Sequence, residues 1–171
     1  MKRRKALQTL SASLGTLLVM PAWANAWNRK LLGAGPGLLN ADQHTLLTEV
    51  VSVLIPDGQI PGAKALGVPA FIEKMMADCY EKPAQTDFKE GLASLDSLAN
   101  AAYGTPFASL QPDKKLAMLT TMQTTENAPQ KAFFSLLKNL TIQGYTTSEY
   151  VMVNHLKYVM APGHYYGCVN V

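Results

Sequence analysis

The sequence has 171 residues, of which 48% are hydrophobic and 16% are charged, a composition typical of a globular chain and not of a disordered one. This length allows one domain with a real core. Four of the 15 basic residues lie within the first 26 positions, which leaves 11 basic against 12 acidic residues, a net charge of −1. Arg29 is then the one remaining arginine, so the composition argues against nucleic-acid binding.

Residues 1–26 have the features of a cleaved export signal. A basic start is followed by a modest apolar stretch and by small residues at Ala24 and Ala26. The stretch is too short and too polar for a stable membrane span, which needs roughly 20 residues. Arg3 and Arg4 resemble the pair of a twin-arginine signal, which exports folded proteins, and an ordinary secretory signal is the alternative. Either signal predicts a periplasmic mature chain.

Residues 27–39 are predicted to be a linker, and residues 40–171 a single all-α domain. Asn40 and Gln43 have the spacing of a capping box, and Pro56 ends the helix that they begin. Proline positions and apolar spacing predict further helices over about 69–79, 84–103, 111–122, 129–144 and 147–156. A compact bundle of about five to six helices follows, with an irregular C-terminal tail from about residue 157.

The apolar spacing also predicts which side chains face the core. The first helix would bury Leu46, Leu47, Val50, Val51, Leu54 and Ile55, and the second Phe71, Ile72, Met75, Met76 and Cys79. The third would use Phe88, Leu92, Leu95, Leu98 and Ala102, and the fourth Leu116, Met118, Leu119 and Met122.

The two cysteines, Cys79 and Cys168, are predicted to form a disulfide in an oxidising compartment. This bond would tie the tail to an early helix. Two free buried thiols are the alternative.

Catalytic and metal-binding motifs are not found in the sequence. The spacing of His44, His155 and His164 to other ligand residues does not match a metal site, and there is no C-x-x-C-H haem motif and no G-x-S-x-G nucleophile motif. Asp57 has the residue type of a general base, but a turn carboxylate that accepts backbone N–H groups is the favoured interpretation. The chain is therefore expected to hold no cofactor and no metal, and to have no catalytic residue of its own.

Three segments together carry a resemblance to a known family. These are "LIPDGQIPGAKALGVPAFIEKMMADCY" from Leu54, "FFSLLKNLTIQGYTTSEY" from Phe133 and "APGHYYGCVNV" from Ala161. They resemble the gluconate 2-dehydrogenase subunit 3 family, and the twin-arginine leader also fits it. His164 departs from the pattern, because an arginine is expected before the tyrosine.

The resemblance implies a non-catalytic small (gamma-type) subunit. Its large partner would be a flavoprotein of the glucose–methanol–choline (GMC) type, which holds FAD and oxidises a sugar or sugar acid such as gluconate. A cytochrome c subunit with haem c is a possible third component. The small subunit would support folding, twin-arginine co-export and stability of the flavoprotein. It would lie in the periplasm, with membrane association only indirect, at the periplasmic face of the inner membrane through the complex.

The same resemblance implies that two segments contact the partner. These are the loop over 56–69, with the candidates Pro56, Asp57, Pro61, Gly62 and Pro69, and the tail, with Pro162, Gly163, Tyr165 and Tyr166. Tyr145, outside both segments, is a further candidate. Packing within the chain is the alternative for both segments. Two other functions stay open: a helical scaffold or binding module for a different periplasmic partner, and a stand-alone enzyme that uses Asp57.

Overall fold

The computed structural model describes residues 37–159, 161 and 163. Six α-helices and one short 3-10 helix make up this part of the chain, which contains no β-strand. The α-helices are α4 (Ala41–Leu54), α5 (Val68–Cys79), α6 (Lys82–Tyr103), α7 (Pro112–Thr124), α8 (Ala128–Thr146) and α9 (Glu149–Asn154), and the 3-10 helix is η1 (Phe107–Ser109). The all-α prediction is therefore confirmed, and η1 is the one element that the sequence did not predict.

Helix α4 begins and ends where its sequence predicts. The backbone N–H of Gln43 donates to the Asn40 side chain at 2.8 Å, and the Gln43 side chain accepts from the backbone N–H of Asn40 at 3.2 Å. These two bonds are the predicted capping box, and they satisfy N–H groups that a helix start leaves unpaired. The helix ends at Leu54, two residues before Pro56.

Helices α5 and α6 form a corner that is closed by a buried amide. Gln85, on α6, is only 5% exposed, and its Nε2 donates to the backbone carbonyls of Ala77 and Tyr80 at 3.2 and 2.9 Å. Carbonyls at a helix C-terminus have no partner within the helix. The side chain of α6 therefore completes the end of α5 and sets the direction of the chain between them.

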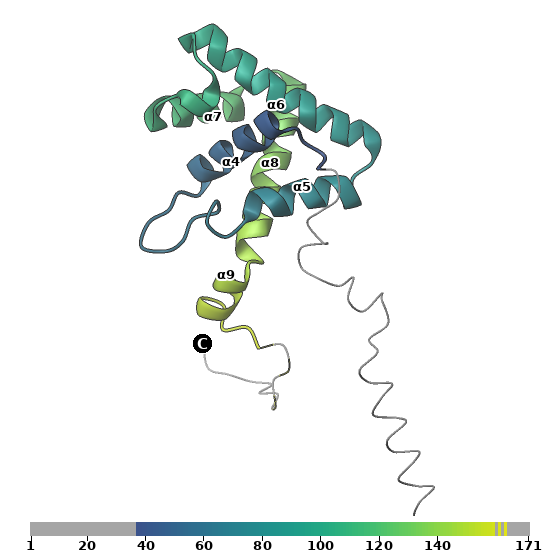
Figure 1. Cartoon of the computed structure of the whole chain (residues 1–171), viewed down its shortest axis with the longest axis vertical. Helices are drawn as coiled ribbons and strands as arrows, with labels where there is room; N and C mark the ends of the chain where they lie inside the picture. The colour runs from purple at the N-terminus through teal and green to yellow at the C-terminus, as the bar shows by residue number, and fades with distance from the viewer. Residues whose placement is uncertain (1–36, 160, 162, 164–171) are drawn as a thin grey trace, which may run out of the picture. The chain divides into compact units, whose positions relative to one another are not determined.

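Helix α8 lies at the centre of the bundle and packs against α4, α5, α6, α7 and α9 (Figure 1). Its buried side chains include Phe134, Leu137 and Leu140. They join one core with residues from α4, α5, α6 and α7, and with Phe107 of η1. Near the C-terminal end of α8, Gly144 lies against the side chains of Val68 and Phe71 of α5. The C-terminal end of this central helix therefore contacts α5.

Four predictions of buried side chains are wrong. Leu116 is 57% exposed, and Lys115 is buried in its place, because the Lys115 ammonium reaches a carboxylate on α4. Leu98 and Ala102 are exposed on α6, where Ala99 takes the inward position after Leu95. Cys79 is exposed as well, because it is the last residue of α5, where the helix leaves the core.

Candidate functional site

The connection between α4 and α5, residues 55–67, is held in one conformation by backbone hydrogen bonds. The N–H of Ala63 donates to the carbonyl of Ile55 at 3.0 Å, so the loop closes on its own start. The Asp57 carboxylate accepts from the N–H of Gly62 at 2.6 Å across the same turn. Asp57 is exposed, and its carboxylate accepts a backbone N–H in a turn, which is the interpretation that the sequence favours.

Gly62 is required by a close approach of the backbone to itself. A Cβ atom at this position would lie 2.6 Å from the Asp57 nitrogen, 2.6 Å from the Pro56 carbonyl carbon and 2.7 Å from the Ile55 oxygen. All three atoms belong to the main chain, which cannot turn aside as a flexible side chain can. The glycine of the "P-G-A" is therefore a structural requirement of this loop.

An ion-pair network connects the loop to two helices. Glu49 of α4 accepts from the ammonium groups of Lys115 at 2.7 Å and Lys64 at 3.2 Å. The hydrogen bond from Lys115 is the main cause that lowers the pKa of Glu49 below its ordinary value. Burial opposes it with the second-largest effect, and the hydrogen bond from Lys64 lowers the pKa further. Lys115 also lies over the Phe107 ring, 5.8 Å from its centroid. The network joins α4, α7 and the loop by charge.

The loop and the C-terminal end of α8 meet, although they are far apart in the sequence. The Tyr145 hydroxyl donates to the carbonyl of Pro61 at 3.2 Å. Beside this contact a groove of about 450 Å³ lies between Ala65 and Leu66 of the loop and Ser148, Tyr150 and Val153 around α9. Glu149 and Asn154 also line it. These groups are typical of a surface that binds through apolar contacts and a few hydrogen bonds.

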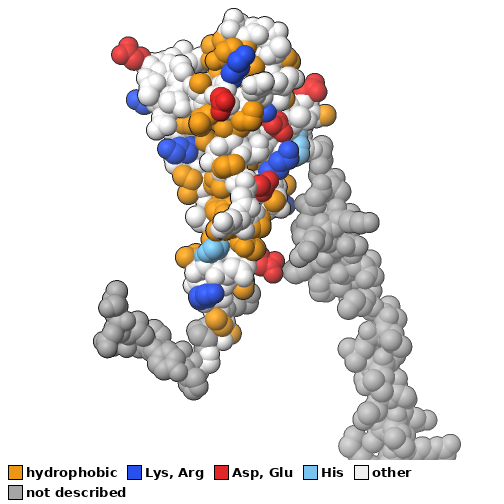
Figure 2. Space-filling view, turned by 90° about the vertical axis from the view of Figure 1, so that its left-hand side faces the viewer, with side chains coloured by type: hydrophobic (Ala, Val, Ile, Leu, Met, Phe, Trp, Pro, Cys, Tyr) orange, Lys and Arg blue, Asp and Glu red, His pale blue; other side chains and the backbone are white. Residues whose placement is uncertain are grey.

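Exposed apolar side chains continue from this groove along α9 and the chain after it. Val153, Leu156, Tyr158 and Val159 are each 53–62% exposed. In Figure 2 apolar side chains are exposed over the lower part of the described chain, where α9 lies. The N–H groups of Leu156 and Tyr158 bond to the carbonyls of Val151 and Met152, so a hydrogen-bonded turn presents them. Helical spacing could not identify this surface, because α9 has only six residues.

The predicted contact residues differ in burial, and some of them lie outside the described residues. Pro56, Asp57 and Gly163 are exposed, and Pro61 and Tyr145 are half-buried. Gly62 and Pro69 are buried, which favours the packing alternative for these two positions. The described residues do not include the contact candidates Pro162, Tyr165 and Tyr166. They also do not include Cys168 of the predicted disulfide or the leader residues Arg3, Arg4, Ala24 and Ala26. The disulfide and the export signal therefore stay predictions.

Other candidate groups are separated in space. Among the described residues no three His, Cys, Asp or Glu side chains are grouped so that they could hold a metal ion. His44 lies 4.0 Å from Glu73, and the ring centroid of His155 lies 5.9 Å from that of Tyr150. Within the same described part, no helix has both the length and the apolar character to cross a membrane.

The loop and the α8–α9 segment also lie within the span that matches a known family. A family model described as gluconate 2-dehydrogenase subunit 3 matches residues 41–163. Comparison with curated proteins and with solved structures found no match. The matched span runs from the first residue of α4 to beyond α9, and it includes every helix described above. The chain therefore belongs to the gluconate 2-dehydrogenase subunit 3 family.

Proposed function

We propose that this chain is the non-catalytic small subunit of a periplasmic dehydrogenase whose large subunit is a GMC-type flavoprotein. The large subunit would hold FAD and oxidise a sugar or a sugar acid. The match to the family over 41–163 is the observation that carries this proposal. The small subunit supports the folding and stability of the flavoprotein, and its leader exports both subunits together by the twin-arginine route. A cytochrome c with haem c is the candidate for a third subunit of the proposed complex.

The form of the loop supports a structural role for its carboxylate. The Asp57 carboxylate accepts from the backbone N–H of Gly62, and among the described residues it takes part in no ion pair and belongs to no group of three side chains that could hold a metal ion. Proton transfer needs a group that is placed to meet a substrate, and here the carboxylate holds a turn. This bond supports the proposal that Asp57 stabilises the loop instead of serving as a general base.

Purification from the periplasm tests the proposal. The chain, with an affinity tag at its C-terminus, is expected to elute with a much larger protein whose absorption spectrum is that of a flavin. The isolated chain is expected to show no flavin absorption. A monomer that elutes alone, or one that elutes with a non-flavin partner, would contradict the proposal, and the second result would favour a scaffold for another protein.

The export part has its own test. Replacing Arg3 and Arg4 together by Lys is expected to leave both this chain and the flavoprotein in the cytoplasm, because twin-arginine transport needs the arginine pair. The matched control replaces Lys2 and Lys5 by Arg, which preserves both the charge and the pair. Normal export of the Arg3→Lys, Arg4→Lys variant would indicate the ordinary secretory route.

A further inference from the structure

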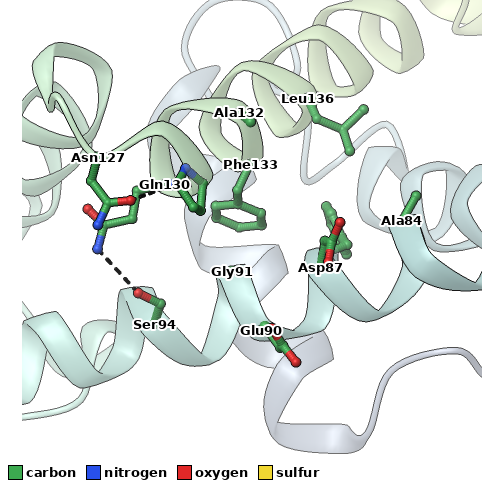
Figure 3. Close-up of a pocket in the computed structure, with 12 residues that line it drawn as sticks. Ala84, Asp87, Glu90, Gly91, Ser94, Asn127, Gln130, Ala132, Phe133 and Leu136 are labelled. Carbon is green, nitrogen blue, oxygen red and sulfur yellow. Dashed lines mark hydrogen bonds between the residues drawn. The ribbon is translucent and has the colours of Figure 1, made fainter.

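A second groove lies between the N-terminal halves of α6 and α8, away from the loop and α9. Its volume is about 670 Å³. The buried rings of Phe88 and Phe133 form its apolar floor together with the half-buried Leu136. Ser94, Asn127 and Gln130 lie at one end (Figure 3). This volume is in the range of sites that accept a small molecule or a few side chains of another protein.

The apolar floor of the groove is preformed. The rings of Phe88 and Phe133 lie with their centroids 5.5 Å apart and are tilted by 57°. Gly91 allows this arrangement, because a Cβ atom there would lie 2.2 Å from Cδ2 of Phe133. Gln130 closes the polar end with a 3.5 Å contact from its Nε2 to the Ser94 hydroxyl, drawn as a dashed line in Figure 3.

The charge of the groove is of one sign and is not compensated. Asp87 and Glu90 lie one helical turn apart on α6, and both are exposed at the wall. Neither carboxylate takes part in an ion pair or hydrogen bond with another described residue, and no Lys, Arg or His lines the groove. An occupant would complement this surface if it carried apolar side chains for the floor and positively charged side chains for the two carboxylates.

The geometry points to a docking site for a short basic peptide segment of another chain, which inserts apolar side chains beside Phe133 and places Lys or Arg against Asp87 and Glu90. On the proposed function, this segment belongs to the flavoprotein. The groove and the loop–α9 surface lie toward opposite ends of α8, at residues 127–136 and 145–154. If the loop–α9 surface also contacts the flavoprotein, the subunit would hold its partner at two separate places.

Charge reversal tests the docking site in the complex. In the Asp87→Lys, Glu90→Lys variant, the amount of flavin that is retained per tagged chain is expected to fall about tenfold or more relative to the wild type. The reason is that like charges then meet across the contact. The control variant is Asp42→Lys, Asp113→Lys, which makes the same change of net charge at exposed positions outside the groove. It is expected to retain flavin within about twofold of the wild type. Helical circular dichroism of each variant, before and after heating, checks that the bundle is intact.

Photo-crosslinking identifies the occupant directly. A diazirine-bearing amino acid replaces Ala132, which lines the groove, or Ala117, an exposed control position on α7. Crosslinks from position 132 are expected to reach a segment of another protein that contains Lys or Arg beside apolar residues. They are expected to fall at least about tenfold in the Asp87→Lys, Glu90→Lys background.

The outcomes separate the docking site from the proposed function. If the wild type carries the flavoprotein and the charge-reversal variant carries as much, the docking site is wrong and the proposed function stands. If the wild type carries no flavoprotein, the proposed function fails, and the position-132 crosslinks decide the groove by themselves. A crosslink to a second copy of this chain, or equal crosslinks from positions 132 and 117, would overturn the docking site in either case.

Discussion

At the scale of single residues, the loop between α4 and α5 is held by side chains that bond to main-chain atoms. Asp57 bonds to the backbone of Gly62, and the Tyr145 hydroxyl bonds to the carbonyl of Pro61. One bond holds the main chain at Pro61, whose ring restricts φ, and the other holds it at Gly62, where a Cβ atom would not fit. The residues that identify the family are therefore residues that shape the loop.

Gly62→Ala is expected to lower the free energy of unfolding by about 1–3 kcal/mol, because its Cβ would collide with main-chain atoms at 2.6–2.7 Å. Gly58→Ala in the same loop is the matched control, since a Cβ there meets no atom within 4 Å. The control is expected to change stability by less than about 0.5 kcal/mol. Urea unfolding followed by circular dichroism measures both variants, and equal stabilities would contradict the close approach.

At the scale of elements, the helices are joined by a small number of polar contacts between them. Gln85 of α6 completes the C-terminus of α5, and Glu49 of α4 binds Lys115 of α7 and Lys64 of the loop. Lys115 is 7% exposed, so its charge needs the Glu49 carboxylate. These contacts fix how neighbouring elements meet, which apolar packing alone leaves less specific.

The stability supplied by Glu49 is expected to depend on pH. Its pKa is lowered in the folded chain, chiefly by Lys115, so folding favours the charged form. The contribution is therefore present above the ordinary pKa of 4.5 and is lost as the pH falls through the lower pKa of the folded chain. At pH 7, Glu49→Gln is expected to reduce the free energy of unfolding by roughly 1 kcal/mol, because the carboxylate is partly exposed to solvent.

Thermal unfolding of the wild type and Glu49→Gln between pH 7 and pH 3 measures this dependence. The difference between them is expected to shrink as the pH falls below 4.5. Asp78→Asn is the control, since the Lys74–Asp78 pair is about 60% exposed on both sides and contributes little. A constant difference at all pH values would show that the Glu49→Gln substitution disturbs packing instead of charge.

At the scale of the whole molecule, the described chain presents two separate surfaces on one helical bundle. The loop and α9 form one with exposed apolar side chains, and α6 and α8 form the other with an acidic wall. This arrangement suits a chain that belongs to a larger assembly, as its family does.

The predicted Cys79–Cys168 disulfide is also a property of the whole chain. It would close a loop of roughly 90 residues, which stabilises the fold by about 4–5 kcal/mol in the chain-entropy model. Cys79 is exposed at the end of α5, so its thiol is not enclosed by the core. Cys79→Ser and a reducing agent are each expected to lower the urea midpoint by the same amount, with no further loss when they are combined.

Thiol titration of the native, oxidised chain provides the direct check on this bond. No free thiol is expected before reduction and two are expected after it. Two reactive thiols in the native chain, or a covalent bond to another protein, would contradict the intramolecular disulfide.

The sequence by itself determined the fold class, the order of the helices and the family. Capping residues, prolines and apolar spacing are local signals, and they placed the boundaries of α4 to α9 within a few residues. The three motifs predicted the family, and the match over 41–163 confirmed it.

Only the tertiary structure decided which positions lie inside and which surfaces are open. Lys115 is buried and Leu116 is exposed because Glu49, 66 residues away in the sequence, holds the ammonium. The α6–α8 groove depends on the contact between Gly91 of α6 and the Phe133 ring of α8. Such contacts depend on residues that are distant in the sequence, and spacing along one helix carries no information about them.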